Sequence, residues 1–414
     1  MITRKAAMSS MHAEREADQD QANLVKEKLD ELLDGFAPDK TPPQAFWGAQ
    51  YDLGLAWVHF PVGMGGLGLS PALNDQVSAR LRSVGAPSNF SRNPIGIGMG
   101  APTVATYASR ELAERLLRPM FTTEEIWCQL FSEPNAGSDV ASLATRAERD
   151  GDEWVINGQK VWTTLAHVSS WGMLVTRTDP TVPKHNGLTY FVVDMRSPGI
   201  EVRPLRQITG EAEFNEVYFN GARIPDSQRL GEVGKGWSAA ITTLMNERVS
   251  LGGNIAPRGS GAIAEAVRVY KESKQKSHGK RDELMKLWVK AEVNRLTTFR
   301  AGQARKAGNP GPEGSVGKLA SAELNQEIYN FCIDTLGAEG LRYGSYEMTR
   351  PELAGVGLER GQRGIQKMFL RSRANSIEGG TSEIMRNILG ERVLGLPGEP
   401  RRDKDLPWNE IPKN

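Results

Sequence analysis

The hydrophobic periodicity of this chain changes twice, and the two changes divide it into three stretches. From about residue 10 to 120, apolar residues recur at helical spacing among charges, as in the run Leu24, Val25, Leu29, Leu32 and Leu33. From about 125 to 230, short alternating runs are separated by turn residues, which predicts β-strands. Helical spacing returns from about 236 to 395. The predicted order is helices, then an antiparallel β domain, then a helical bundle.

The length of the chain, 414 residues, is more than one hydrophobic core usually supports, so several domains are expected. We expect an N-terminal helical domain over 1–124, a middle β domain over 125–232 and a C-terminal helical bundle over 233–398. Residues 399–414 are polar and contain proline, and we expect them to form a loose polar tail.

Composition and charge exclude several classes of protein. The net charge is +1, so bulk electrostatics give no reason to expect a nucleic-acid surface. Cys128 and Cys332 are too few for a disulfide scaffold or a four-ligand zinc site, and the five histidines lack metal-site spacing, so no metal is expected. No apolar run approaches the roughly 20 residues that cross a bilayer, and the charged N-terminus is unlike a secretory signal, so we expect a cytoplasmic protein.

The first candidate site is the run Gln-Leu-Phe-Ser-Glu-Pro-Asn-Ala-Gly-Ser-Asp at 129–139. It leaves a predicted strand, turns at Pro134 and presents Ser132, Ser138 and several backbone N–H groups. Turns of this composition form concavities that bind anions or carbonyl groups. A plain turn without a ligand is the alternative. A glycine-rich segment at 63–68, by contrast, has no β–α–β unit after it, and we interpret it as a packed loop between helices.

The second candidate is the run Gly-Gln-Lys-Val-Trp-Thr-Thr at 158–164. The dipeptide Asn157-Gly158 predicts a β-hairpin turn at its start. Trp162 then lies on a strand beside two hydroxyl groups. It is either a core residue or a flat wall for a planar heteroaromatic ring.

The third candidate is Glu247, on a helix predicted to begin near Gly236. At roughly 100° per residue its side chain falls beside Ala240, Leu244 and Leu251, and no cation lies three or four residues away. A carboxylate on such a face should have a raised pKa, as a general base requires. A buried Glu paired with an Arg from another helix is the alternative.

The fourth candidate is the pair Gly379-Gly380 before Thr381. It predicts a helix N-terminus with free backbone N–H groups, at a place where the backbone comes close to another group. An ordinary glycine-led helix start is the alternative.

Together these stretches resemble the acyl-CoA dehydrogenases over about residues 20–398. The run at 132–139 is similar to the family's first signature, although Leu130 replaces its usual small first residue. The run at 158–164 is similar to the second, and Gly-Thr-x-x-Ile-x-Arg at 380–386 to the third. The resemblance implies an α+β fold: an N-terminal helical domain, a middle antiparallel β-barrel domain and a C-terminal four-helix bundle. It also implies FAD and an acyl-CoA substrate.

The resemblance further implies which residues meet these ligands. Contacts with the cofactor are expected from Gln129, Leu130, Phe131, Ser132, Ser138, Trp162, Thr163, Thr164, Thr381 and Glu383. Contacts with the substrate are expected from Ser138, Arg248 and Gly379.

The position of the catalytic base differs between branches of the family. Many members carry it immediately before the Gly-Thr of the third motif, where this chain has Gly379, and Glu378 is one residue out of register. A shift of one residue turns a side chain through roughly 100°. A second branch, including the isovaleryl and long-chain types, carries the Glu on the first C-terminal helix before an Arg, as Glu247 and Arg248 do here. We therefore expect Glu247 to take the α-proton, flavin N5 to take the β-hydride and a trans-2-enoyl-CoA to form, with the Gly379 N–H polarising the thioester carbonyl.

Other functions remain open at this point. An acyl-CoA oxidase, a nitroalkane-oxidase-like enzyme or a flavin monooxygenase would share the fold. A non-catalytic partner subunit or a nucleic-acid-binding relative is a further alternative, against which Glu247 and the near-zero net charge argue. The expected electron acceptor is an electron-transfer flavoprotein.

The resemblance also predicts a partner chain. In homotetrameric members an Arg-x-x-Phe-Gly run and a later Gln reach the FAD diphosphate of a neighbouring subunit. Here Gln275 and His278 replace the Arg and Phe, and Asp334 replaces the Gln. Lys274 or Lys276 as a substitute cation is the alternative. We expect a second, related subunit in an α2β2 assembly, with a homotetramer as the alternative. Paired members act on bulky steroid-derived acyl-CoAs, which makes that substrate class an expectation.

Overall fold

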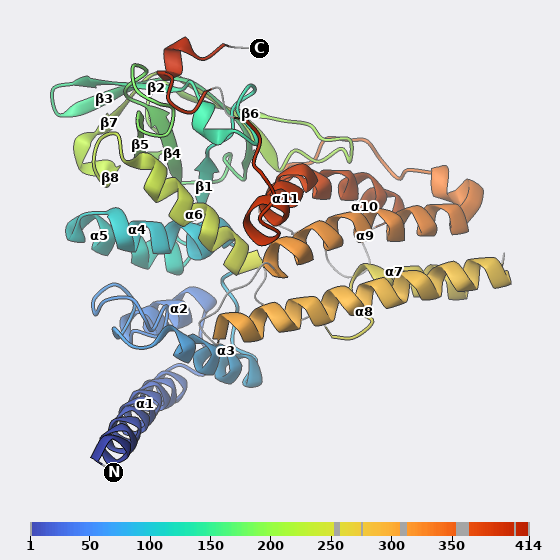
Figure 1. Ribbon diagram of the computed structural model, residues 1–414, viewed down its shortest axis with the longest axis horizontal. Helices are drawn as coiled ribbons and strands as arrows, with labels where there is room; N and C mark the ends of the chain where they lie inside the picture. The colour runs from blue at the N-terminus through green and yellow to red at the C-terminus, as the bar shows by residue number, and fades with distance from the viewer. Residues whose placement is uncertain are drawn as a thin grey trace.

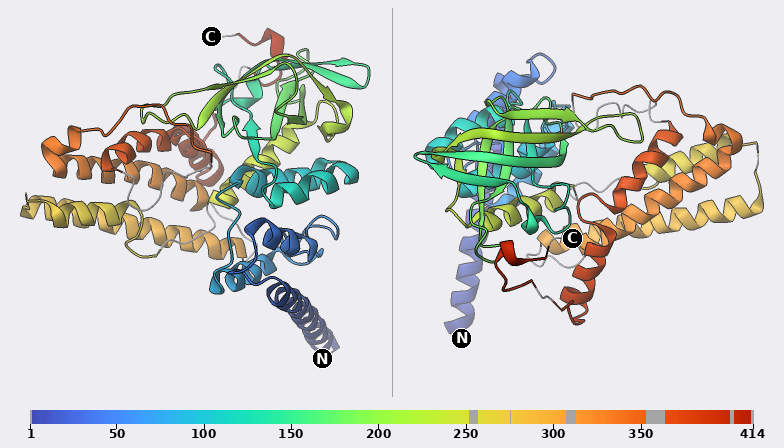
Figure 2. Two further views of the ribbon diagram at one scale, coloured as in Figure 1. Left: turned by 180° about the vertical axis from the view of Figure 1, so that it is seen from behind. Right: turned by 90° about the horizontal axis from the view of Figure 1, so that it is seen from above.

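The order of helices and strands follows the change in periodicity along the chain. The computed structural model describes residues 2–251, 257–274, 276–306, 313–352, 364–400 and 403–412. Within these ranges, N-terminal helices precede one sheet, and further helices follow it (Figure 1). Figure 2 shows the sheet and the last helices as separate parts of the molecule, side by side.

The N-terminal helices pack around a core of buried aromatic and aliphatic side chains. They are α1 (Ile2–Gly35), α2 (Pro43–Asp52), α3 (Asn74–Ser83), α4 (Ala101–Tyr107) and α5 (Arg110–Phe121). The hydroxyl of Ser109 accepts a hydrogen bond from the backbone N–H of Leu112 and so caps α5. The glycine-rich segment at 63–68 is a packed loop, as expected: a Cβ on Gly65 would lie 2.5 Å from the ring of Tyr51.

One mostly antiparallel sheet forms the middle of the chain. Its strands are β1 (Trp127–Leu130), β2 (Arg146–Asp150), β3 (Glu153–Thr164), β4 (Trp171–Arg177), β5 (Leu188–Asp194), β6 (Ile200–Pro204), β7 (Phe214–Pro225) and β8 (Arg229–Leu230). Their order is β6-β7-β3-β2-β4-β5-β8, and β1 pairs in parallel with β4. Alternate residues of β4 face two cores: Met173 packs with the N-terminal helices, and Leu174 packs inside the sheet domain.

The predicted hairpin turn at Asn157-Gly158 is wrong. Strand β3 runs through both residues, and the turn between β2 and β3 lies at Gly151, whose φ is 63°. Gly158 is required for a different reason, because a Cβ there would lie 2.5 Å from Oγ1 of Thr145. The close approach of Thr145, just before β2, and a φ of 152° explain this glycine, and not a turn.

The helices after the sheet fall into two groups. They are α6 (Gly236–Leu251), α7 (Ala262–Glu272), α8 (His278–Lys306), α9 (Glu313–Leu336), α10 (Ile365–Ser372) and α11 (Ser382–Ile388). Helix α6 contributes Ala239 and Ala240 to the core of the N-terminal helices. The later helices have a core of their own, which includes Ile263, Leu287 and Ile328. Helices α7 to α11 thus extend to one side of the molecule (Figure 1).

The end of the chain is attached to the sheet domain, so the expectation of a loose tail is wrong for residues 403–412. The backbone N–H of Trp408 donates to the carbonyl of Val182 at 2.9 Å, and Pro407 forms a β-bridge with Pro183. The segment lies against the sheet domain in Figure 1. The segment is otherwise polar, but it contains Trp408, whose large aromatic side chain is partly buried. Burial of this side chain favours attachment of the segment to the sheet domain.

Candidate functional site

The first motif forms a tight turn directly after β1. Glu133 and Ala136 exchange backbone hydrogen bonds of 3.0 and 3.1 Å around Pro134. The carboxylate of Glu133 is buried and accepts hydrogen bonds from the backbone N–H groups of Ala144 and Thr145, at 2.7 and 2.9 Å. The acid of this motif is therefore an internal anchor of the turn.

Lys160, from the second motif, holds the same carboxylate. Its Nζ atom donates to Oε1 of Glu133 at 2.8 Å and to the carbonyl of Phe131 at 3.1 Å, and its side chain is fully buried. Burial alone would raise the pKa of the Glu133 carboxyl, but Lys160 and the hydrogen bonds from Thr145 and Ala144 outweigh it, and the pKa lies below its usual value. Glu133 is thus ionised at neutral pH, as the partner of Lys160.

A β-bulge places Trp162 on the surface beside the first motif. Between the pairs Lys160↔Val217 and Thr163↔Asn215, β3 has one residue more than β7. Trp162 has a φ of 59°, in the left-handed region that non-glycine residues avoid, and its side chain is 57% exposed. An exposed aromatic residue held in such a conformation points to a functional surface.

The bulge also brings the two motifs into contact. The backbone N–H of Val161 donates to the carbonyl of Ser132 at 2.9 Å. The indole of Trp162 meets the ring of Phe214 edge-on, with 5.8 Å between the ring centroids. No glycine or turn dipeptide stands at the bulged residue, so no local signal in the sequence marks it.

The expected cofactor contacts of these two motifs differ in exposure. Ser132, Gln129 and Thr164 are half-buried, and Ser138 is exposed. The side chains of Leu130, Phe131 and Thr163 are buried, so a ligand at the surface would meet the backbone of these residues.

The third motif starts helix α11. The hydroxyl of Thr381 accepts a hydrogen bond from the backbone N–H of Ile384 at 3.1 Å and caps this helix, whereas Glu383 is exposed. Gly379 and Gly380 have φ values of 62° and 96°, which explains the two glycines.

The carboxylate of Glu378 is already occupied. Arg371 donates two hydrogen bonds to it, at 3.0 and 2.8 Å, and Nδ2 of Asn375 donates a third at 2.8 Å. A general base needs a free carboxylate oxygen that faces the substrate, whereas both oxygens of Glu378 accept hydrogen bonds from Arg371. That Glu378 is not the catalytic base stays a prediction.

Arg371 also connects the third motif to the end of the second. Its Nε atom lies 3.8 Å from Oε1 of Glu213, and the carbonyl of Glu213 accepts a hydrogen bond from the backbone N–H of Leu165 at 2.9 Å. Burial is the largest influence on the Glu213 carboxyl and raises its pKa, while Arg371 opposes this. Neither Arg371 nor Glu213 was predicted as a site residue, since neither belongs to a motif.

The predicted base lies outside the described side chains. Glu247 and Arg248 belong to α6, but only the backbone of this last part of the helix is described. One turn earlier, Oγ1 of Thr243 lies 2.8 Å from Oγ1 of Thr103 and 3.0 Å from the hydroxyl of Tyr190. These buried contacts fix α6 against α4 and β5. Glu247 and Arg248 stay predictions.

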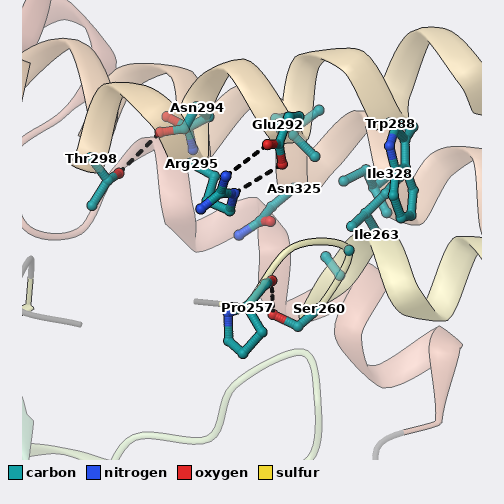
Figure 3. Close-up of a pocket in the computed structure, with 14 residues that line it drawn as sticks. Pro257, Ser260, Ile263, Trp288, Glu292, Asn294, Arg295, Thr298, Asn325 and Ile328 are labelled. Carbon is teal, nitrogen blue, oxygen red and sulfur yellow. Dashed lines mark hydrogen bonds and ion pairs between the residues drawn. The ribbon is translucent and has the colours of Figure 1, made fainter. Parts of the chain in front are cut away.

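A cavity of about 200 Å³ lies elsewhere, among α7, α8 and α9 (Figure 3). Ile263, Trp288 and Ile328 form its apolar wall, and Glu292 and Arg295 form an ion pair of 2.7 Å beside it. None of its lining residues belongs to the three motifs. The cavity is therefore separate from the site that the motifs form.

Comparison with known proteins decides the family. A family model described as the acyl-CoA dehydrogenase middle domain matches residues 128–222, and one described as the acyl-CoA dehydrogenase C-terminal domain matches residues 234–394. The chain is 36% identical over 351 residues to acyl-CoA dehydrogenase IpdE1 of Mycobacterium tuberculosis, a match that covers 84% of this chain and 86% of IpdE1. This protein belongs to the acyl-CoA dehydrogenase family.

Two further comparisons agree with this assignment. The chain is 37% identical over 348 residues to acyl-CoA dehydrogenase FadE34 of the same organism, but the match covers 84% of this chain and only 45% of FadE34, so the chain spans less than half of that relative. The solved ChsE4-ChsE5 complex from Mycobacterium tuberculosis superposes with a TM-score of 0.67 at 26% identity, covering 92% of this chain and 98% of that chain.

As an acyl-CoA dehydrogenase, the protein is an oxidoreductase of a flavoprotein family, and its fold has the three parts that the sequence predicted. Among the described residues, no group of three or more His, Cys, Asp or Glu side chains is placed to hold a metal ion. No helix in the described ranges combines the length and apolar character needed to cross a membrane.

Proposed function

We propose that this chain uses FAD to dehydrogenate an acyl-CoA thioester between Cα and Cβ, which yields the trans-2-enoyl-CoA. The observation that carries the proposal is the contact between the first two motifs, where the Val161 N–H meets the Ser132 carbonyl at 2.9 Å beside the exposed Trp162. Trp162 offers an aromatic face, and Ser132 and Thr164, half-buried residues of the same two motifs, offer hydroxyl groups, a set suited to a flat, polar-edged ring. FAD, when bound, accepts the hydride from Cβ at its N5 atom.

The remaining chemistry belongs to residues of the chain. Glu247 removes the proton from Cα, and the N–H of Gly379 donates to the thioester carbonyl, which acidifies that proton. Because Arg371 donates hydrogen bonds to both carboxylate oxygens of Glu378, we assign the role of general base to Glu247 and not to Glu378. Arg248 holds the substrate.

The diphosphate of a ligand is proposed to lie near the first motif, and the adenosine part of FAD near the third. Ser138 is exposed. The neighbouring Asp139 would repel a phosphate, but Lys184 lies 2.7 Å from its carboxylate and offsets the negative charge. Thr381 and Glu383 contact the adenosine part of FAD in this proposal.

We also propose that a second acyl-CoA dehydrogenase-like chain completes an α2β2 assembly. Helix α8 carries a stripe of large apolar side chains on one face, each 43–58% exposed: Met285, Val289, Val293, Leu296 and Phe299. A stripe of this kind marks a surface that another protein covers. Asp334, which stands where other members carry a Gln that reaches a neighbour's FAD diphosphate, is exposed. Gln275 lies outside the described residues. A homotetramer is the alternative.

The proposed pairing also supports a proposal for the acyl group. The solved ChsE4-ChsE5 relative is a complex of two named chains. Because paired members of the family act on bulky steroid-derived acyl-CoAs, we propose that substrate class here. The proposed electron acceptor is an electron-transfer flavoprotein.

One experiment tests the reaction. The protein, co-expressed with a candidate partner subunit, is titrated without oxygen against acyl-CoAs from butyryl-CoA to steroid-side-chain thioesters while flavin absorbance is recorded. The expected result is bleaching by at least one thioester. Bound flavin that no thioester bleaches would contradict the proposal, and rapid oxygen consumption with an acyl-CoA would favour an oxidase.

A further inference from the structure

The C-terminal segment 403–412 connects two loops of the sheet domain. Trp408 donates from its backbone N–H to the carbonyl of Val182 at 2.9 Å and from Nε1 to the carbonyl of Ser142 at 3.2 Å. Asn409 donates to the carbonyl of Pro180 at 3.0 Å. The segment thus touches both the loop after β4 and the turn that follows the first motif.

A buried cation lies beneath Trp408. The guanidinium of Arg177 is 4.5 Å from the centroid of the indole ring. It donates to the carbonyls of Ala141, Leu143 and Lys184 at 2.6, 3.1 and 3.1 Å. Burial lowers the pKa of Arg177 to about 10, so the aromatic face of Trp408 supplies a favourable partner for a desolvated charge.

A second cation joins the segment to the same turn. Nζ of Lys184 lies 2.7 Å from Oδ2 of Asp139 and 2.6 Å from Oδ2 of Asp403, and the lysine is buried. The hydroxyl of Ser142 also donates to Asp139, at 2.5 Å. Both ends of the turn at 138–143 are therefore fixed by groups that contact residues 403–412.

We propose that residues 403–412 are a positioning strap that orders the turn at 138–143 for the diphosphate of a nucleotide ligand. Trp408 acts through Arg177 and the carbonyls of Ala141 and Leu143, so it is a positioning residue that need not touch the ligand. The proposal rests on the proposed role of Ser138 at a diphosphate. FAD and coenzyme A both carry that group, and they are tested separately.

The test uses Trp408→Leu in the full chain, with its partner subunit if the assembly needs one. Hydrogen exchange is measured across the protein, and the affinities for FAD and for free coenzyme A are measured by calorimetry. We expect faster exchange at 138–143 and 179–187, and a roughly tenfold weaker affinity for at least one nucleotide. Trp408→Phe keeps an aromatic face and should restore most of both properties. Leu406→Ala, in the same segment, is the matched control.

The outcomes separate the strap from the proposed function. Unchanged exchange at 138–143 in Trp408→Leu would overturn the strap. Faster exchange with unchanged affinity for both nucleotides would overturn its role in binding. If the wild-type protein binds neither FAD nor coenzyme A, the proposed function fails, whatever the exchange data show. Should Trp408→Leu fail to fold, Asp403→Asn weakens the contact with Lys184 and is expected to give the same pattern with smaller changes.

Discussion

Nζ of Lys160 lies 2.8 Å from Oε1 of Glu133, and both side chains are buried. The two residues belong to different motifs, 27 positions apart in the chain. Their ion pair fixes strand β3 to the turn after β1, and it thereby sets the distance between Trp162 and Ser132.

Replacing Lys160 with Met should destabilise the protein strongly. The Glu133 carboxylate would stay buried without its cation, which typically costs about 3–5 kcal/mol in the free energy of unfolding. Denaturant unfolding measures the change. The double variant Glu133→Gln/Lys160→Met should lose less than Lys160→Met alone. The control is Lys290→Met, at the exposed pair with Glu327, where a loss of about 1 kcal/mol or less is expected. Equal losses at both sites would refute the role of the buried pair.

The stabilisation by Glu133 should depend on pH. Its folded-state pKa is lowered, so its contribution is complete above the ordinary value of 4.5 and is lost as the pH falls through the folded value. The difference in unfolding free energy between the wild type and Glu133→Gln should be largest at neutral pH and shrink in acid. A difference that stays constant across this range would contradict the assignment.

Glu247→Gln should retain FAD but lose flavin reduction by acyl-CoA, by roughly 10²–10⁴-fold, because the amide cannot accept the α-proton. Stopped-flow flavin bleaching measures this rate. Glu378→Gln is the matched control and should change the rate little, since Arg371 and Asn375 already occupy that carboxylate. The reverse order of the two effects would place the base at Glu378.

Trp162→Ala should lower FAD retention while changing the free energy of unfolding by no more than about 1 kcal/mol, because the side chain is exposed and its backbone is strained. The flavin content per chain and thermal unfolding are the two measurements. Trp154→Ala is the control: Trp154 is buried, and a loss of about 3–5 kcal/mol is expected there. Unchanged flavin content and spectrum in Trp162→Ala would make Trp162 a purely structural residue.

The chain expressed alone should be poorly soluble or poor in flavin, and co-expression with a related subunit should correct both. Val293→Glu places a charge in the apolar stripe of α8 and should prevent assembly without unfolding the chain. Sedimentation and flavin content are the measurements. A stable homotetramer of this chain alone, with one FAD per chain and full activity, would refute the partner proposal.

The order of helices and strands was predictable because hydrophobic periodicity is a local property of the sequence. The motifs at 132–139, 158–164 and 380–386 were recognisable for the same reason, since each is a short run of fixed residue types. Local signals failed where a distant segment competed with them. Asn157-Gly158 favours a turn, but pairing with β7 and the approach of Thr145 keep both residues in a strand. The C-terminal segment is polar, which favours a loose tail, yet Trp408 donates a hydrogen bond to the carbonyl of Ser142, 266 positions away in the chain.

The sequence by itself determined the family, the succession of elements and the residue types available for chemistry. The tertiary structure alone decided how these residues meet: the exposed, bulged Trp162 beside Ser132, and Arg371 between Glu213 and Glu378. Each of these arrangements joins segments that are not adjacent in the chain. The free energy that fixes them comes from burial, strand pairing and ion pairs between those segments, which no local pattern of residues encodes.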